Sequence, residues 1–277
     1  MGIRLSSVTV LAAGIVLLAW WARQPGGATS AAQEATDATQ AGHSENAASI
    51  PVLVELFTSE GCSSCPPADA LLSRLGRTQP VRGADIIALE EHVDYWDRLG
   101  WKDPFSSEAA TARQGEYGQA FGGRQVYTPQ MIVDGRAEFV RSSDTDALRA
   151  IRAASQSQKP AIQLSWEKDD TLAIHVEPRN NAGQRDGQQL YLVVAENMLH
   201  SDVKRGENAG RALEHNGVVR QLLPLGKADA AEAGFSSSVA VHPDQGWNRA
   251  NLLAVIFVQE RRSRHILAAA AIPFPKV

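Results

Sequence analysis

The sequence predicts a mixed α/β domain with a helical insert, followed by an all-β, sandwich-like domain. Three observations support this fold class. Between residues 50 and 156, short apolar strand patterns alternate with helical patterns. A helical insert from about Asp94 to Gly123 interrupts this first half. Beyond residue 160 helical patterns almost disappear, and short alternating strands follow one another.

The N-terminal segment has the pattern of an export signal. An apolar run from Val8 to Ala22 follows Arg4, and small residues at Ala28–Ala32 offer a cleavage site. The run is short of the roughly 18–20 residues of a membrane-spanning helix, although tryptophans near its end also fit an uncleaved anchor. We therefore expect an exported protein, periplasmic or secreted, with residues 1–31 as signal peptide or anchor. Residues 32–49 lack an apolar period and are expected to be a flexible linker.

Composition limits the partners. Of the 277 residues, 21% are charged and the net charge is −4, with no strongly basic segment. Nucleic acid is therefore not expected as a partner, and membrane contact is expected only through an uncleaved N-terminal segment.

Local signals define the elements of the first half. Pro66 and Pro67 suit the first turn of a helix, Ser107 and Asp144 can cap two further helices, and Asp134-Gly135 is a strong hairpin turn. The predicted strands are Val52–Phe57, Ala84–Leu89, Met131–Val133 and Ala137–Val140; the predicted helices run from Pro66 to about Arg77, from Glu108 to about Phe121 and from Asp144 to about Ala154.

A polar stretch around Pro160 marks a predicted linker, so we expect domains at 50–156 and 160–277. Beyond it, period-2 alternation and β-rich runs predict strands. They are Ile162–Trp166, Leu172–Val176, Leu190–Ala195, Val218–Leu223, Phe235–Val241, Leu252–Val258 and Ile266–Ile272.

Both cysteines of the chain, Cys62 and Cys65, lie between the first predicted strand and the first predicted helix. In an oxidising compartment two thiols this close tend to pair. The start of a helix favours a thiolate, so this placement suits redox chemistry. Cys62 would be the exposed nucleophile and Cys65 the buried resolving thiol.

Two other interpretations of the cysteine pair stay open. A purely structural disulfide closing so small a loop contributes only about 2 kcal/mol. Two thiolates are half of a tetrahedral zinc site, but with His92 they could bind or deliver Cu(I). The leading interpretation requires neither a metal ion nor a cofactor.

Further candidates lie elsewhere in the chain. A Thr128-Pro129 bond precedes a central strand, where proline is unusual, and a cis bond would leave a backbone edge for a substrate peptide. His92 and Asp94 follow a predicted parallel strand, at the edge where open α/β sheets bind ligands. In the second half, the Gly-flanked stretch with Glu207, Asn208 and Arg211 could bind a partner or complete a turn. His215 and His242 lack matching ligand neighbours in the sequence, and we expect no special role for them.

These features resemble the thioredoxin superfamily, in which a strand, a C-x-x-C, a helix and a later Thr-Pro follow in this order. More narrowly, the chain looks like an exported bacterial family of unknown function with a thioredoxin-like fold, over about residues 51–277. The likeness rests on the stretches Glu55–Asp69, His92–Trp101, Tyr127–Met131 and Gly206–Arg211.

The resemblance implies roles for individual residues. Cys62 matches the nucleophile, Cys65 the resolving cysteine and Pro129 the cis-proline, and Glu55 lies one residue from the position of a buried proton acceptor. The implied activity is thiol-disulfide exchange with protein thiols or disulfides, or with a periplasmic redox partner. Between the cysteines stands Ser63-Ser64 instead of the Gly-Pro of reducing thioredoxins, so the direction of electron flow is not implied. A binding module whose disulfide is structural is the remaining alternative.

Overall fold

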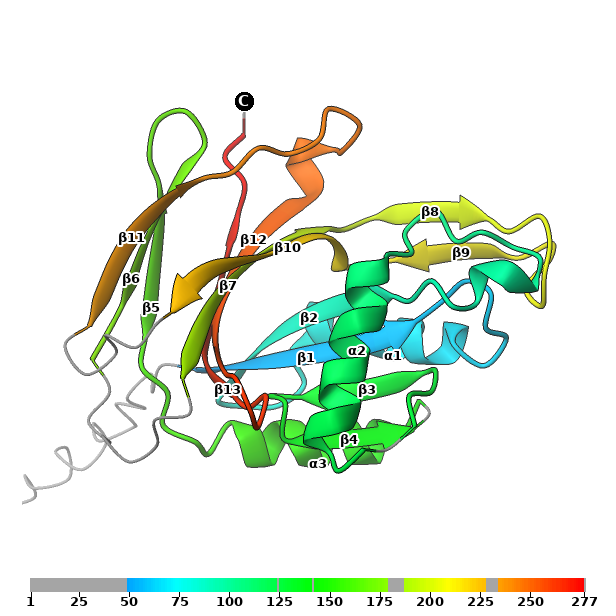
Figure 1. Ribbon diagram of the computed structural model, residues 1–277, viewed down its shortest axis with the longest axis horizontal. Helices are drawn as coiled ribbons and strands as arrows, with labels where there is room; N and C mark the ends of the chain where they lie inside the picture. The colour runs from blue at the N-terminus through cyan, green and yellow to red at the C-terminus, as the bar shows by residue number, and fades with distance from the viewer. Residues whose placement is uncertain (1–48, 124, 141, 179–186, 228–233, 277) are drawn as a thin grey trace, which may run out of the picture. The chain divides into compact units, whose positions relative to one another are not determined.

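The computed structural model describes residues 49–276, apart from positions 124, 141, 179–186 and 228–233 (Figure 1). This described part is a mixed, sheet-dominated α/β protein with few helices. The predicted signal peptide or anchor and nearly all of the predicted linker lie outside it. Among the described residues, no helix has the length and apolar character needed to cross a bilayer.

The predicted elements of the first half are confirmed, with small differences at their ends. They are β1 (Ile50–Thr58), α1 (Pro66–Thr78), β2 (Ala84–His92), α2 (Glu108–Ala120), β3 (Gln130–Val133), β4 (Ala137–Val140) and α3 (Asp144–Ala154). The structure adds a short 3-10 helix, η1 (Asp97–Leu99), that was not predicted. Strand β2 continues through Glu90, Glu91 and His92, and all three are buried. The sequence placed the end of this strand too early because charged residues rarely occupy a buried strand.

The second half contains the predicted strands and one hairpin that the sequence did not predict. The elements are β5 (Ile162–Trp166), β6 (Thr171–Val176), β7 (Gln188–Glu196), β8 (Leu199–Asp202), β9 (Ala212–His215), β10 (Val218–Lys227), β11 (Phe235–Ala240), the 3-10 helix η2 (Arg249–Asn251), β12 (Leu252–Glu260) and β13 (Ile266–Pro273). The β8–β9 hairpin was missed because each of its strands has only four residues, of which three are polar in β8 and two in β9.

Strands of both halves form one eight-stranded sheet with the order β13-β12-β7-β10-β2-β1-β3-β4. Strands β1 and β2 are parallel, and β3 pairs with β1 in the antiparallel direction. The halves meet where Val218 of β10 pairs with Glu90 of β2. The sheet therefore crosses the predicted domain boundary. The thioredoxin-like assignment of the first half and the sandwich-like assignment of the second stay predictions.

The central strand β1 packs on both of its faces. Val54 and Leu56 face one core with residues of α1 and α3, whereas Phe57 faces a second core with Tyr117 of α2. The period of two along a strand explains this division. It also places Glu55 on the same face as Phe57, toward α2.

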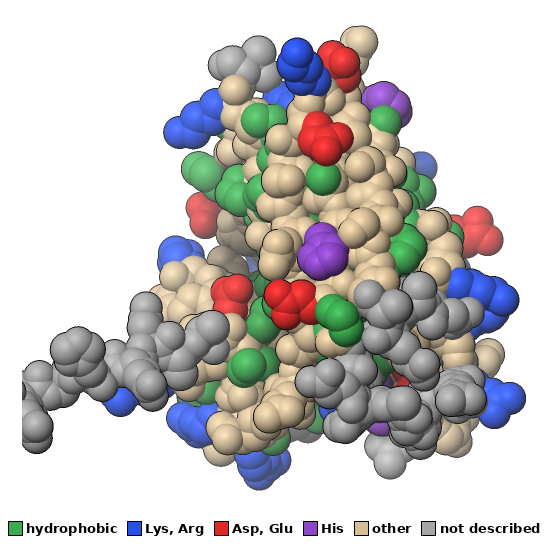
Figure 2. Space-filling model, turned by 90° about the vertical axis from the view of Figure 1, so that its left-hand side faces the viewer, with side chains coloured by type: hydrophobic (Ala, Val, Ile, Leu, Met, Phe, Trp, Pro, Cys, Tyr) green, Lys and Arg blue, Asp and Glu red, His purple; other side chains and the backbone are tan. Residues whose placement is uncertain are grey.

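A three-stranded sheet, β11-β6-β5, packs against β7, β12 and β13 of the large sheet. Its inward side chains include Leu172, Ile174 and Val176, all buried. Serines, a glutamine and His175 alternate with them and point outward. Figure 2 shows this outer face, on which uncharged polar groups predominate.

Gly217, which precedes β10, brings the two halves of the sheet into close contact. Its carbonyl accepts a hydrogen bond from the N–H of Glu90 (2.8 Å), its φ is +72°, and an added Cβ would lie 2.3 Å from the carbonyl oxygen of Ala88. We expect Gly217→Ala to lower the free energy of unfolding by about 2–3 kcal/mol, through both overpacking and backbone strain. Urea denaturation measures this loss.

The matched control is Gly210→Ala. Gly210 also has a positive φ, +82°, but an added Cβ would meet no atom within 4 Å. Only the backbone strain remains, about 1–2 kcal/mol. Equal losses in the two variants would show that the contact with Ala88 is unimportant.

Candidate functional site

The two cysteines form a disulfide at the turn between β1 and α1. Their Cα atoms are 5.4 Å apart. Cys65 is the N-cap residue of α1, and Pro66 and Pro67 occupy its first turn. The predicted strand-to-helix placement of the pair is therefore confirmed.

The prediction that Cys62 is exposed is wrong for this oxidised structure. Cys62 is 1% exposed and Cys65 is 0% exposed. A loop between β8 and β9, residues 203–211, binds the cysteine turn and is called the capping loop here. The side-chain amide of Asn208 donates to the carbonyl oxygens of Glu60 (2.8 Å) and Cys62 (3.0 Å).

Two further contacts hold the capping loop. The N–H of Ser63 donates to the Glu207 carboxylate (3.0 Å), and Arg211 donates to the side-chain oxygen of Asn208 (2.8 Å). The hydrogen bond from Ser63 lowers the pKa of Glu207. From the sequence, Glu207, Asn208 and Arg211 could either bind a partner or complete a turn. In the structure they lie beside the turn that carries the disulfide.

The predicted cis bond between Thr128 and Pro129 is confirmed. The hydroxyl of Thr128 accepts a hydrogen bond from the indole N–H of Trp96 (2.9 Å). An added Cβ on Gly61 would lie 3.1 Å from Cβ of Trp96. Trp96 thus lies between the Thr128-Pro129 bond and the residue that precedes Cys62. The substrate-binding roles predicted for Thr128 and Pro129 stay predictions.

Glu55 is buried and its carboxylate is engaged by α2. Arg113 donates to one oxygen of Glu55 (2.6 Å), and the hydroxyl of Tyr117 donates to the other. Arg113 also lies 3.3 Å from Glu91 and hydrogen-bonds Gln259 (3.1 Å). In this structure Glu55 anchors α2 on the sheet. Its predicted role as proton acceptor stays a prediction.

His92 and Asp94, predicted together, have separate surroundings. Asp94 accepts a hydrogen bond from the hydroxyl of Thr111 (2.6 Å), and this contact fastens the start of the insert to α2 within it. His92 is the last residue of β2, and its Nδ1 lies 2.7 Å from the Asp103 carboxylate.

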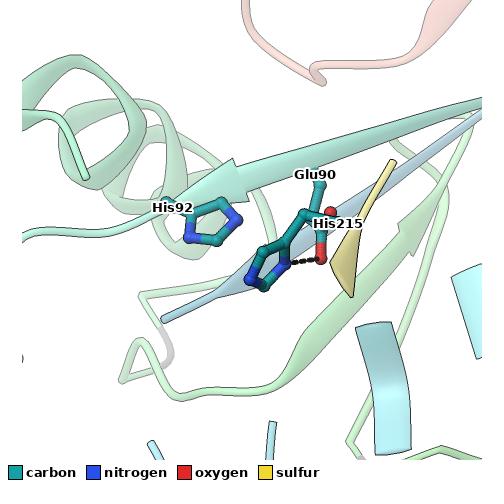
Figure 3. A group of neighbouring side chains, drawn as sticks. All are labelled: Glu90, His92 and His215. Atoms are coloured by element: carbon teal, nitrogen blue, oxygen red, sulfur yellow. Dashed lines mark hydrogen bonds and ion pairs between the residues drawn. The ribbon is translucent and has the colours of Figure 1, made fainter. Parts of the chain in front are cut away.

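His215, for which no role was expected, is buried beside His92. Their ring centroids are 4.8 Å apart (Figure 3). Its Nδ1 lies 3.0 Å from Glu90, and its Nε2 lies 3.3 Å from Glu60. Glu90, His92 and His215 could hold a metal ion. Sequence spacing cannot reveal this group because its members come from β2 and from the end of β9.

Comparison with known proteins identifies the family. A family described as "Protein of unknown function (DUF1223)" matches residues 53–259. The chain belongs to this family.

Solved structures similar to this DUF1223 chain support the fold alone. Protein AGR_C_4864 from Agrobacterium tumefaciens has a TM-score of 0.63 and 24% sequence identity, covering 83% of this chain and 96% of its own. HBP35 of Porphyromonas gingivalis has a TM-score of 0.60 and 16% identity, covering 83% of this chain and 77% of its own. No curated protein matches this DUF1223 chain.

A buried acid near the disulfide of this DUF1223 protein was missed from the sequence. Asp69 is 6% exposed, accepts a hydrogen bond from the hydroxyl of Thr58 (2.6 Å), and its N–H donates to the carbonyl of Cys65 (3.1 Å). Burial, reinforced by Glu90, raises the pKa of Asp69 to about 8. The available signal was its position four residues after Cys65, on the same helix face.

The raised pKa of Asp69 predicts how stability depends on pH. Unfolding returns the carboxyl to its ordinary pKa of 3.8, so the unfolded state releases a proton that the folded state keeps up to about pH 8. The stabilisation that the protonated Asp69 carboxyl contributes is fully present below about pH 4. It is lost as the pH rises toward 8. Asp69→Asn should reduce the slope of unfolding free energy against pH by up to about 1.4 kcal/mol per pH unit. Denaturation at several pH values tests this, with Asp85→Asn, which changes an exposed carboxylate, as control. Equal slopes in the wild type and Asp69→Asn would refute it.

Proposed function

We propose that this protein is an exported thiol-disulfide oxidoreductase-like protein that uses Cys62 and Cys65. The observation that carries the proposal is the Cys62–Cys65 disulfide at the N-terminus of α1. A disulfide that only clasps its own turn contributes little stability and does not require this position. A helix N-terminus, in contrast, stabilises the thiolate that forms when such a bond opens.

The exchange uses the two sulfurs in turn. A thiolate of a partner protein attacks Sγ of Cys62, a mixed disulfide forms, and Cys65 leaves as a thiolate. A second partner thiol then displaces Cys62, so the partner gains a disulfide and the pair becomes a dithiol. The two protons of the partner thiols pass to the Cys62 and Cys65 thiolates. The reverse sequence reduces a partner disulfide.

Two observations suit Cys62 as the sulfur that bonds to the partner. Its Sγ lies 3.4 Å from the hydroxyl of Ser64, which can donate to the Cys62 thiolate that leaves in the second step. Ser63 and Ser64 are exposed, so a partner can approach on this side. Because the cysteines themselves are buried, exchange requires the capping loop to release Ser63 and the carbonyl of Cys62.

The proposal is tested with a peptide dithiol and its disulfide as substrates. The wild-type protein should catalyse their interconversion in a glutathione buffer, whereas Cys62→Ser should not. Cys65→Ser should accumulate a mixed disulfide with the peptide. A wild-type protein without catalysis, together with a Cys62 pKa at or above its ordinary value near 8.5, would rule the proposal out.

The same variants address the alternatives. If recognition by the β-rich half is the function and the disulfide is a clasp, Cys62→Ser/Cys65→Ser keeps full function. The copper alternative requires His92 beside the two sulfurs. Among the described residues, the group that could hold a metal ion joins His92 to Glu90 and His215 and contains no cysteine. The redox proposal is therefore better supported.

A further inference from the structure

Three buried side chains lie close together beside the β8–β9 hairpin. Glu90, His92 and His215 are each 1% exposed. One ligand atom from each of them lies within 4.8 Å of the others, and Figure 3 shows these three side chains pointing toward one another. Glu60, also 1% exposed, lies on the far side of the His215 ring from Glu90, 3.3 Å from Nε2.

Nε2 of His92 lacks a hydrogen-bond partner among the described residues. Nε2 of His215 and Oε1 of Glu60 make no hydrogen bond there either, but they face each other as an ion pair at 3.3 Å. Burying polar atoms without partners is costly, so such atoms require an explanation. Imidazole nitrogens and carboxylate oxygens are ligands of transition-metal ions.

A surrounding set of contacts orients these ligands. Asp103 binds Nδ1 of His92 at 2.7 Å, so Nε2 faces the group. Glu60, which contacts Nε2 of His215, is itself held by hydrogen bonds that its other oxygen accepts from Trp101 (2.7 Å) and Ser201 (3.1 Å). The other oxygen of Glu90 accepts one from the N–H of Asn216 (3.1 Å). Histidine ligands of metal ions typically donate their other ring N–H to a carboxylate, and carboxylate ligands are typically hydrogen-bonded as well.

We propose that Glu90, His92 and His215 bind a divalent transition-metal ion, with Zn²⁺ as the best fit. Two imidazoles and one carboxylate, with the fourth position open, are a known set of ligands for tetrahedral zinc. Ligands about 2.1 Å from such an ion lie roughly 3.4 Å apart, and the ligand atoms here lie within 4.8 Å of one another, so the side chains must close around the ion. The site is separate from the disulfide and does not depend on the proposed redox activity.

The neighbouring carboxylates also act on the two imidazoles. Burial lowers the pKa of His215, but Glu90 and Glu60 raise it more, to about 11. Asp103 and Glu90 likewise outweigh burial and raise the pKa of His92.

Zinc titration of the full-length, metal-stripped protein tests the site. We expect one equivalent of Zn²⁺ per chain by calorimetry and by metal analysis after dialysis. Asp103→Asn should weaken binding by about 10–100-fold, and His92→Gln and His215→Gln should weaken it more. His175→Gln, which changes an exposed histidine, is the control. Cys62→Ser/Cys65→Ser should keep the full affinity, which separates this site from a thiolate site.

Cobalt substitution of the wild-type protein gives a test that does not depend on the folding of variants. Co²⁺ should give visible bands of a four-coordinate site without the charge-transfer band of a cobalt–thiolate bond. The proposal is overturned if the wild type binds no Zn²⁺, if both histidine variants keep wild-type affinity, or if the cobalt spectrum shows thiolate ligation.

Discussion

Arg113→Ala is expected to lower the free energy of unfolding by about 3–5 kcal/mol, because it leaves a buried carboxylate without its cation. Arg113 is 5% exposed and contacts both Glu55 and Glu91. Burial raises the pKa of Glu91 to about 8 although Arg113 opposes the shift, so Glu91 is largely protonated at neutral pH. Glu55 is then the counter-ion that loses its partner.

The surroundings of Arg113 explain why another cation cannot replace it. Its guanidinium lies 5.1 Å from the ring centres of Tyr117 and Phe257 and 5.8 Å from that of Tyr191. A planar group stacks in this space and still donates to Glu55, whereas an ammonium group cannot do both. Arg113→Lys should therefore also destabilise the protein.

Urea denaturation with an unchanged m-value measures the loss. The control is Arg149→Ala, which removes an exposed ion pair with Asp146 on α3 and should cost at most about 1 kcal/mol. The double variant Glu55→Gln/Arg113→Met should recover part of the loss, because it removes both charges. A loss below about 1 kcal/mol in Arg113→Ala would show that the pair does not anchor α2.

Asn208→Ala is expected to accelerate exchange at the disulfide by about 10–100-fold. The variant removes two hydrogen bonds from the capping loop to the cysteine turn, each worth about 1 kcal/mol net. If the loop must open before a thiol reaches Cys62, each 1.4 kcal/mol lost from the closed state raises the open fraction about tenfold. The rate of reduction by a small thiol, followed by trapping of free cysteines, measures this effect.

A second variant at position 208 and a control variant make this test more specific. Asn208→Asp keeps the size of the side chain but turns a donor into an acceptor that faces two carbonyl oxygens, so it should accelerate reduction at least as much. Asn248→Ala, which alters the cap of η2, should leave the rate unchanged. Unchanged rates in both Asn208 variants would show that the loop does not limit access.

The elements that depend on local sequence patterns could be predicted from the sequence. Apolar periodicity and the prolines identified β1 and α1, and the position of Thr128-Pro129 before a strand indicated the cis bond. Local patterns do not specify which strands pair across the chain. The contact between Gly217 and β2, which joins the halves into one sheet, was therefore not predictable from periodicity.

The candidate site was predictable only in part, for the same reason. Only two residues separate Cys62 from Cys65, so their pairing was evident. The carbonyl of Cys62 is bound by Asn208, which is far away along the chain. Glu90 and His92 stand in a strand whose charged end looked like a loop, and His215 ends a short hairpin strand that was missed.

The most direct test of the proposed redox activity is a titration of the Cys62–Cys65 pair in glutathione buffers, read by alkylation and mass spectrometry. We expect one two-electron transition with a midpoint above about −300 mV, in the range of exchange-active rather than structural disulfides. The Asn208→Ala variant should reach equilibrium faster. A pair that stays fully oxidised at the reducing end in both proteins would contradict the account.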